Sequence, residues 1–276
     1  MRRSSKFPLA VILSMAVLLG LIAVAPGFLA DLGVSARIAQ TGRISVQQPD
    51  TKPWNGPVPT SGYDISYPQC QSAPLPGDSG FAIIGVNGGR PGTEQPCLEQ
   101  QLEWARTQRA MAVYVNTEYL GKGSPAGVGV RTAKDAIARM REAGIPAQMP
   151  VWLDVETENE WRGDHEQHRE LVQALARKLA ASGHPVGLYS APRLWARITG
   201  SADPGMPVWL AIGRGTRAQA LEACAGPGLG GRQPAIVQWV QPGPGGHLVD
   251  HNVLCSSLDP EGMLWPNASA AGPAAS

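Results

Sequence analysis

The chain has 276 residues, of which 43% are hydrophobic and 16% are charged, a composition typical of a globular protein with one large core. Its 23 basic and 22 acidic side chains leave a formal net charge of +1, and basic residues cluster only at the extreme N-terminus. We therefore expect no nucleic-acid partner, because nucleic-acid-binding proteins need a concentrated positive field.

Residues 1–30 have the features of an export segment. Arg2, Arg3 and Lys6 precede a long uncharged run, as in a secretory signal or a membrane anchor. The apolar stretch, residues 9–25, is intermediate in length between a signal peptide and a membrane span, so two interpretations stay open: a cleaved signal peptide, or an uncleaved helix that anchors the protein in the membrane. Both predict a protein that is secreted or held in the cell envelope.

Residues 31–61 are polar and proline-containing, and they show no sustained hydrophobic period, which predicts a linker. The next segment, residues 62–265, alternates short apolar runs with helical patterns, which favours one α/β domain with a mostly parallel sheet. Residues 266–276 are almost entirely Ala, Ser, Gly and Pro, which predicts a disordered tail.

Eight apolar or β-branched runs predict eight strands, which suggests a closed, TIM-like (β/α) barrel. Little helix is expected between the last two strands, so the barrel should be irregular. Helices are predicted to begin near Thr132 and Asp164, each with a capping residue three positions later. The predicted strands cover residues 63–66, 81–86, 111–116, 149–155, 186–190, 208–212, 236–240 and 248–253.

The cysteines number four and all lie beyond the export segment: Cys70, Cys97, Cys224 and Cys255. An even count in an exported chain indicates disulfides. Three pairings are possible, and we favour Cys70–Cys97 with Cys224–Cys255 because each bond would join neighbouring elements. A zinc site is the rival interpretation, but no Cys-x-x-Cys pair supports it.

Acidic residues lie at predicted strand ends, where parallel barrels place their active sites. They are Asp64, Asp154, Glu156 and Asp250. Asp154 and Glu156 are two residues apart, so on a strand both side chains point the same way, with backbones about 6 to 7 Å apart. Crowded carboxyls raise one another's pKa, which suits glycoside hydrolysis because that reaction needs one protonated and one ionised group.

Aromatic residues near the strand ends fit a saccharide groove, although core packing is the alternative for each of them. Trp152 alternates with Asp154 and Glu156, shares their face, and is the preferred wall of a sugar subsite. The full set is Tyr63, Tyr67, Trp152, Tyr189, Trp209 and Trp239.

Short motifs in these segments resemble the family 25 glycoside hydrolases, which are lysozymes of the muramidase type, and especially an exported actinobacterial branch of that family. The resemblance covers residues 62–255. The motifs are Gly62-Tyr63-Asp64-Ile65-Ser66, Leu153-Asp154-Val155-Glu156, Gly187-Leu188-Tyr189-Ser190, Val208-Trp209-Leu210-Ala211 and Val249-Asp250-His251-Asn252.

The resemblance implies that Glu156 is the general acid and that Asp154 stabilises the transition state or orients the acetamido group of the substrate. Asp64 and Asp250 would shape the electrostatics. The implied reaction is cleavage of the β-1,4 bond between N-acetylmuramic acid and N-acetylglucosamine in peptidoglycan, by a route in which the substrate assists. No metal or cofactor is expected, and we expect a monomer.

The chain departs from the family pattern after the second predicted strand. Where the family usually reads Lys-Ala-Thr-Glu-Gly, residues 85–89 read Gly-Val-Asn-Gly-Gly, so two charged side chains are lost. Asn87 and Asn116, the latter in place of a frequent histidine, are the candidate polar contacts with substrate. Two hypotheses follow: an exported glycosidase of the cell wall, or a catalytically inactive glycan-binding or scaffold protein on the same barrel.

Overall fold

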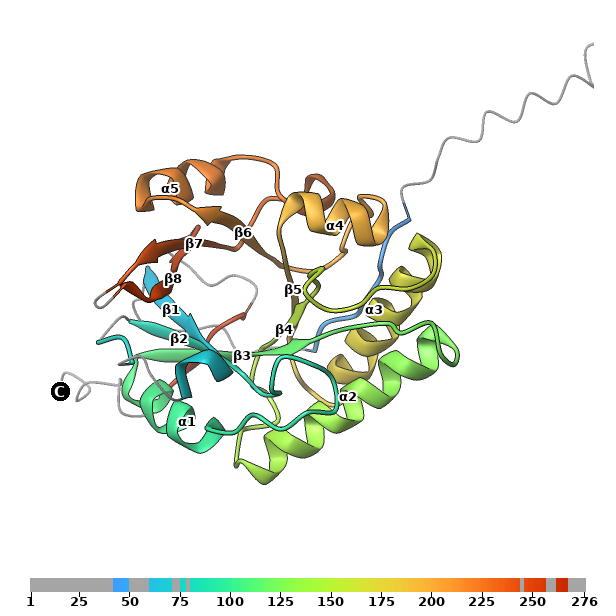
Figure 1. Cartoon of the computed structure of the whole chain (residues 1–276), viewed down its shortest axis with the longest axis horizontal. Helices are drawn as coiled ribbons and strands as arrows, with labels where there is room; N and C mark the ends of the chain where they lie inside the picture. Colours follow the sequence, from blue (N-terminus) through green and yellow to red (C-terminus); the bar gives the residue numbers. More distant parts are fainter. Residues whose placement is uncertain are drawn as a thin grey trace, which may run out of the picture. The chain divides into compact units, whose positions relative to one another are not determined.

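Figure 1 shows a computed structural model, in which residues 42–49, 60–70, 75–77, 80–243, 246–256 and 262–267 are described. The N-terminal export segment, residues 31–41 and 50–59 of the predicted linker, and residues 268–276 of the predicted tail lie outside these ranges. Within the described ranges, no helix has the length and apolar character needed to cross a membrane.

The strands form a closed ring of eight, with helices α1 to α5 on its outside (Figure 1). All eight predicted strands are present, so the predicted irregular TIM-like barrel is confirmed. Strand β8 is antiparallel to both of its neighbours, β7 and β1, whereas the other pairs are parallel. The strands are β1 Ser61–Ile65, β2 Phe81–Gly85, β3 Ala110–Asn116, β4 Val151–Asp154, β5 Val186–Ser190, β6 Val208–Arg214, β7 Ile236–Pro242 and β8 Leu248–Leu254.

A ninth strand, β9 (Trp265–Pro266), was not predicted. It pairs with the beginning of β3, and two residues are too short to carry a hydrophobic period. No helix separates β7 from β8 among the described elements. The helices are α1 Leu98–Thr107, α2 Pro125–Glu142, α3 His165–Ala180, α4 Pro192–Thr199 and α5 Arg217–Ala225, with 3-10 turns η1 at Tyr67–Cys70 and η2 at Leu229–Gly231.

Helix boundaries follow capping chemistry. Asp164 caps α3 as predicted, in a reciprocal capping box with Gln167. The predicted start of α2 at Thr132 is wrong: the helix begins two turns earlier, where Ser124 accepts a hydrogen bond from the Gly127 amide and proline fills the first helical position. Gly129 lies inside α2 because a β-carbon there would collide with the backbone of α3, so a residue that weakens a helix here permits close packing.

Two apolar layers hold the barrel together. Outward-facing strand residues such as Val113 and Leu153 pack against helix residues such as Val172 and Leu175. The inner layer fills the barrel itself and is formed by Phe81, Ile83, Ala110, Ala112, Tyr114, Trp152, Trp209, Ile236, Leu254, Met263 and Leu264. Because strand side chains alternate between faces, a single strand can contribute to both layers, as β3 does with Val113 and Tyr114.

Covalent and local ties fix the barrel's surface segments. The favoured disulfide pairing is confirmed: Cys70 is bonded to Cys97, and Cys224 to Cys255. Residues 42–49, predicted as linker, lie against the barrel. Ile44 is buried there, and the Gln48 side chain exchanges two hydrogen bonds with the backbone of Val186 in β5. This part of the predicted linker therefore belongs to the barrel surface.

Candidate active site

A cavity of about 570 Å³ opens at the end of the barrel where the parallel strands finish. The structure brings all four predicted carboxylates into its lining: Asp64, Asp154, Glu156 and Asp250. Asp250 was expected to close a strand, and this is wrong, because it lies near the beginning of β8. Since β8 runs antiparallel, Asp250 nevertheless pairs with Asp64 across the ladder and reaches the same end.

Asp64 is held by amides. Only 8% of it is exposed; Gln238 Nε2 donates to both of its oxygens at 3.0 Å, and Asn252 Nδ2 donates at 2.6 Å. Burial, followed by the charge of Asp250, raises the pKa of Asp64 well above its ordinary value, while the two amide donors oppose the rise. The carboxyl is therefore fixed in place at the floor of the cavity.

Asp154 is fixed by a relay of two asparagines. Asn116 Nδ2 donates to Asp154 Oδ2. The backbone of Asn116 is gripped by Asn87, whose Oδ1 accepts from the Asn116 amide at 3.1 Å and whose Nδ2 donates to its carbonyl at 3.3 Å. Burial and the charge of Glu156 raise the pKa of Asp154 well above its ordinary value.

Two oxygens in this relay have no hydrogen-bond partner among the described residues. Asp154 Oδ1 and Asn116 Oδ1 are buried and accept no hydrogen bond from any described residue, although both residues line the cavity. Buried polar atoms in native proteins are normally satisfied. The relay therefore leaves two acceptors unused next to the cavity.

Glu156 follows β4 and has the chemistry of a proton donor. Burial raises its pKa to about 7, and the nearby charges of Glu158 and Asp250 add to the rise. The pKa of Asp250 is likewise raised by burial, to about 6. A carboxyl that keeps its proton near neutrality, next to further carboxyls, is what acid-assisted cleavage of an acetal requires.

The predicted polar and aromatic contacts divide into two groups. Tyr67, Asn116, Tyr189 and Trp209 line the cavity. Trp209 is almost fully buried at its floor, where its Nε1 donates to Asn252 Oδ1 at 2.8 Å. Asn87 does not line the cavity and acts beneath it, through Asn116.

The predicted contact with sugar is corrected for three aromatic residues, because they do not line the cavity: Trp152, Tyr63 and Trp239. The Trp152 ring shares the face of Asp154 but lies one layer deeper, fully buried. Tyr63 and Trp239 alternate with Asp64 and Gln238 along their strands, so they point to the opposite face. There both rings pack on His251, with centroid separations of 5.0 and 5.1 Å.

Several lining residues were not predicted. Gln238 and Tyr114 line the cavity, whereas Asn252 donates to Asp64 without lining it. Asn252 and Tyr114 share strand faces with Asp250 and Asn116, so strict alternation would have found these two. Glu158 and Arg90 also line the cavity, from loops. No sequence pattern predicts their position.

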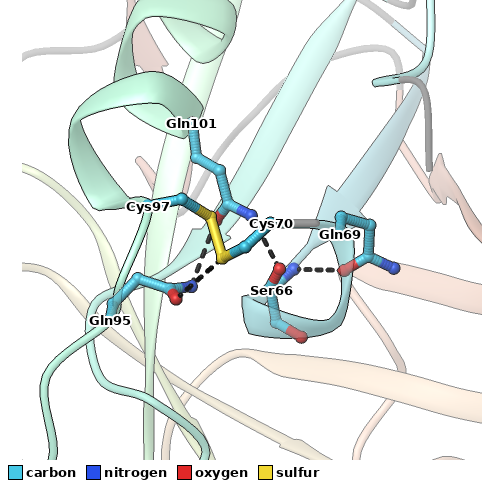
Figure 2. Close-up of a disulfide and its surroundings, with 6 residues drawn as sticks. All are labelled: Ser66, Gln69, Cys70, Gln95, Cys97 and Gln101. Carbon is cyan, nitrogen blue, oxygen red and sulfur yellow. Dashed lines mark hydrogen bonds between the residues drawn. A yellow bond between two sulfur atoms is a disulfide. The ribbon is translucent and has the colours of Figure 1, made fainter. Parts of the chain in front are cut away.

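One wall of the cavity is formed by the turn η1, which a disulfide anchors (Figure 2). Figure 2 shows the Cys70–Cys97 bond together with the glutamines that surround it. Gln101 Nε2 donates to the Ser66 carbonyl at 2.6 Å, and the Ser66 amide donates to Gln69 Oε1 at 2.9 Å. These ties hold the turn that carries Tyr67.

Comparison with known proteins agrees with this geometry. Residues 97–222 match the family model described as "Lysozyme-like protein 1". This match covers less than half of the chain, so it shows a similarity of that part to the lysozyme-like family. Within the matched range fall Asn116, Asp154, Glu156, Tyr189 and Trp209, whereas Asp64 and Asp250 lie outside it.

A curated relative of the chain is Lysozyme-like protein 5 of Caenorhabditis elegans, 31% identical over 109 residues. The match covers 38% of this chain and 49% of the relative, so the chain spans about half of that protein's length.

Solved structures share the fold of this barrel. A muramidase from Acremonium alcalophilum has a TM-score of 0.51 at 15% identity, covering 71% of this chain and 93% of the muramidase. The modular autolysin LytC from Streptococcus pneumoniae has a TM-score of 0.50 at 16% identity, covering 70% of this chain and 46% of the autolysin. The predicted resemblance to muramidase-type lysozymes is confirmed; the actinobacterial branch stays a prediction.

Proposed function

We propose that this protein hydrolyses β-1,4 glycosidic bonds in peptidoglycan or a related amino-sugar polymer. The observation that carries the proposal is the environment of Glu156, whose pKa is raised to about 7 by burial in a cavity that also holds Asp154, Asp64 and Asp250. The similarity to a muramidase and a lysozyme-like protein supports the same substrate class.

Glu156 is the proposed general acid. Its proton passes to the leaving glycosidic oxygen as the bond from the anomeric carbon to that oxygen breaks. In the substrate-assisted route, the acetamido carbonyl oxygen bonds to the anomeric carbon, and the Asp154 carboxylate accepts the hydrogen bond of the acetamido N–H. Water then opens the ring intermediate and returns its proton to Glu156. Asp64 and Asp250 stabilise the developing positive charge.

We place this activity outside the cytoplasm. Two disulfides in the described barrel favour an oxidising compartment. Residues 1–30, as a signal peptide or an anchor, would deliver the protein there.

The experiment compares Glu156→Gln with the wild type on purified peptidoglycan, with new reducing ends identified by mass spectrometry. Loss of the general acid should lower the rate about 100- to 10,000-fold. The matched control is Glu142→Gln, which makes the same change in an exposed side chain at the end of α2 and should leave the rate unchanged.

An unchanged rate in Glu156→Gln contradicts the enzyme proposal. If the wild type binds the polymer but releases no products, the alternative is favoured instead: a catalytically inactive glycan-binding or scaffold protein. The departures after β2 and β3, where Asn87 and Asn116 stand, are the observation behind that alternative.

A further inference from the structure

The cavity lining is strongly acidic and contains a single cation. Of the described residues that line it, five are carboxylates and only Arg90 carries a positive side chain. Arg90 is exposed, and within the described residues its guanidinium makes no ion pair or hydrogen bond. The positive charge of Arg90 acts to lower the pKa of Glu118, although burial raises that pKa overall.

Hydrogen bonds hold the backbone of the loop that carries Arg90. The Arg90 carbonyl accepts two hydrogen bonds from Thr93, from its amide at 3.2 Å and from its hydroxyl at 2.6 Å. Arg139 Nη2 donates to the Gly92 carbonyl at 3.3 Å, and Asn87 pairs with Glu94 at the base of the loop. The backbone position of Arg90 is therefore fixed before any ligand arrives.

Two glycines let this loop approach Tyr67. A β-carbon at Gly88 would collide with the Glu94 carbonyl, and one at Gly89 would lie 2.7 Å from Tyr67 Cε1. Gly89 also has a φ of +85°, a conformation that residues with side chains avoid. The sequence Gly88-Gly89-Arg90 thus brings the chain against the Tyr67 ring, and Arg90 is the next residue of the cavity lining.

The same disulfide supports both parts of this rim. Cys70 ends the turn that carries Tyr67, and Cys97 follows the Arg90 loop by a few residues (Figure 2). Gln95, from the end of that loop, donates through Nε2 to Gln101 Oε1 at 3.2 Å, and Gln101 in turn holds Ser66. Tyr67 and Arg90 are therefore held in one frame.

We propose that Tyr67 and Arg90 form a specificity subsite for a carboxylate substituent of the glycan, with Arg90 binding the carboxylate and Tyr67 covering the adjoining apolar group. This inference rests on the proposed function and names its substrate class. An uncommitted guanidinium on a held backbone, in the same cavity lining as the Tyr67 ring, is suited to bidentate carboxylate recognition. A neutral amino-sugar polymer such as chitin offers no such group, whereas N-acetylmuramic acid carries a lactyl carboxyl that is either free or extended by an acidic peptide.

The carboxyls around the site do not forbid an anionic ligand. Burial raises the pKa of Glu156 to about 7 and that of Asp250 to about 6, so below these values the cavity carries less negative charge than its composition suggests. Binding of the anionic substituent should therefore strengthen as the pH falls from 8 to 6.

The test measures binding by calorimetry with the full-length protein. The probes are the disaccharide of N-acetylglucosamine and N-acetylmuramic acid, its methyl ester, and the same disaccharide bearing an acidic dipeptide. The wild type should bind the free acid or the dipeptide form about tenfold more tightly than the ester, the gain expected of one charge-assisted contact. Which of the two binds more tightly identifies the lactyl or the peptide carboxylate as the ligand.

Arg90→Gln should abolish the preference and leave ester binding unchanged, and Arg90→Lys should restore part of it, because it keeps the charge but not the planar donor pair. The matched control is Arg141→Gln. Arg141 is exposed in the last turn of α2, and because α2 leads from the end of β3 to the beginning of β4, that turn lies at the opposite end of the barrel from the cavity.

A preference that persists in Arg90→Gln, or a wild type that binds acid and ester equally or binds neither, overturns the subsite. If Arg90→Gln weakens all probes equally, Arg90 merely balances the acidic lining, which also overturns it. The proposed hydrolysis is judged separately, by reducing ends from peptidoglycan. Turnover with no Arg90-dependent preference refutes only the subsite, and preference without turnover refutes only the hydrolysis.

Discussion

The two halves of the barrel interior are built from the same strands but from opposite kinds of side chain. Strand β4 supplies Trp152 to one half and Asp154, two residues on, to the other. The Trp152 half is fully buried and apolar. The Asp154 half gathers carboxyls whose pKa values are raised chiefly by burial.

The apolar layer around Trp152 stabilises the fold. The acidic layer around Asp154 does not, and other side chains must keep its carboxyls in position. Apolar burial contributes favourably to folding, whereas burying ionised carboxyls costs free energy. The apolar layer is closely packed: a β-carbon at Gly187 would collide with the Trp152 ring. Asn116 and Gln238 show what the second layer needs, since their side-chain amides donate to Asp154 and Asp64 and fix them.

The largest expected effect tests the apolar layer. Trp152→Ala should lower the free energy of unfolding by about 3 to 5 kcal/mol, because it empties a fully buried site. Trp152→Phe should cost less, since it fills most of the volume and removes an indole nitrogen that has no hydrogen-bond partner among the described residues. Urea unfolding measures both. A loss below about 1 kcal/mol for the alanine variant would show that this layer does not carry the stability.

A smaller effect of opposite sign is expected in the acidic layer. The ordinary pKa of a glutamate is 4.5, and that of Glu156 is about 7. Between these values the folded chain holds a proton that the unfolded chain has lost, so the contribution of Glu156 to stability falls as the pH rises through this window and stays low above it. Glutamine cannot ionise and avoids the loss.

Glu156→Gln should therefore raise the free energy of unfolding by about 1 to 3 kcal/mol at pH 8 and have little effect at pH 4. Chemical unfolding at the two pH values measures the difference, with Glu142→Gln as the control that should show no such dependence. A gain that is the same at both pH values would mean that burial of the charge is not its cause.

Sequence patterns predicted the elements whose physics is local. Buried strands are short apolar runs, and all eight were found. The Asp164 cap is set by residues three apart, and the acids at the ends of β1 and β4 follow from the rule for parallel barrels. The start of α2 was missed because Gly127 and Gly129 obscure a helix that packing against α3 makes favourable.

The composition of the site was less predictable because it depends on which face each strand residue takes and on loops. Tyr63 and Trp239 have the right residue type and the wrong face, which the position of Asp64 in the same strand could have revealed for Tyr63. Asp250 reaches the cavity only because β8 runs antiparallel. Arg90 is placed by the contacts of its loop with Tyr67 and Thr93, and those contacts exist only in three dimensions.

The smallest expected effect tests the two faces of the strands. Tyr63→Phe should change the rate of peptidoglycan hydrolysis by less than about twofold, because the ring packs on His251, away from the cavity. Tyr189→Phe makes the same chemical change on the inner face. There the hydroxyl donates to Gln238 Oε1 at 2.9 Å, and Gln238 in turn donates to both oxygens of Asp64. Loss of that anchor should lower the rate about tenfold. Reducing-end assays on the two variants compare them directly. Equal losses of rate would mean that the two faces of the strands contribute equally to hydrolysis. A larger loss in Tyr63→Phe would place the active site on the His251 side of the sheet.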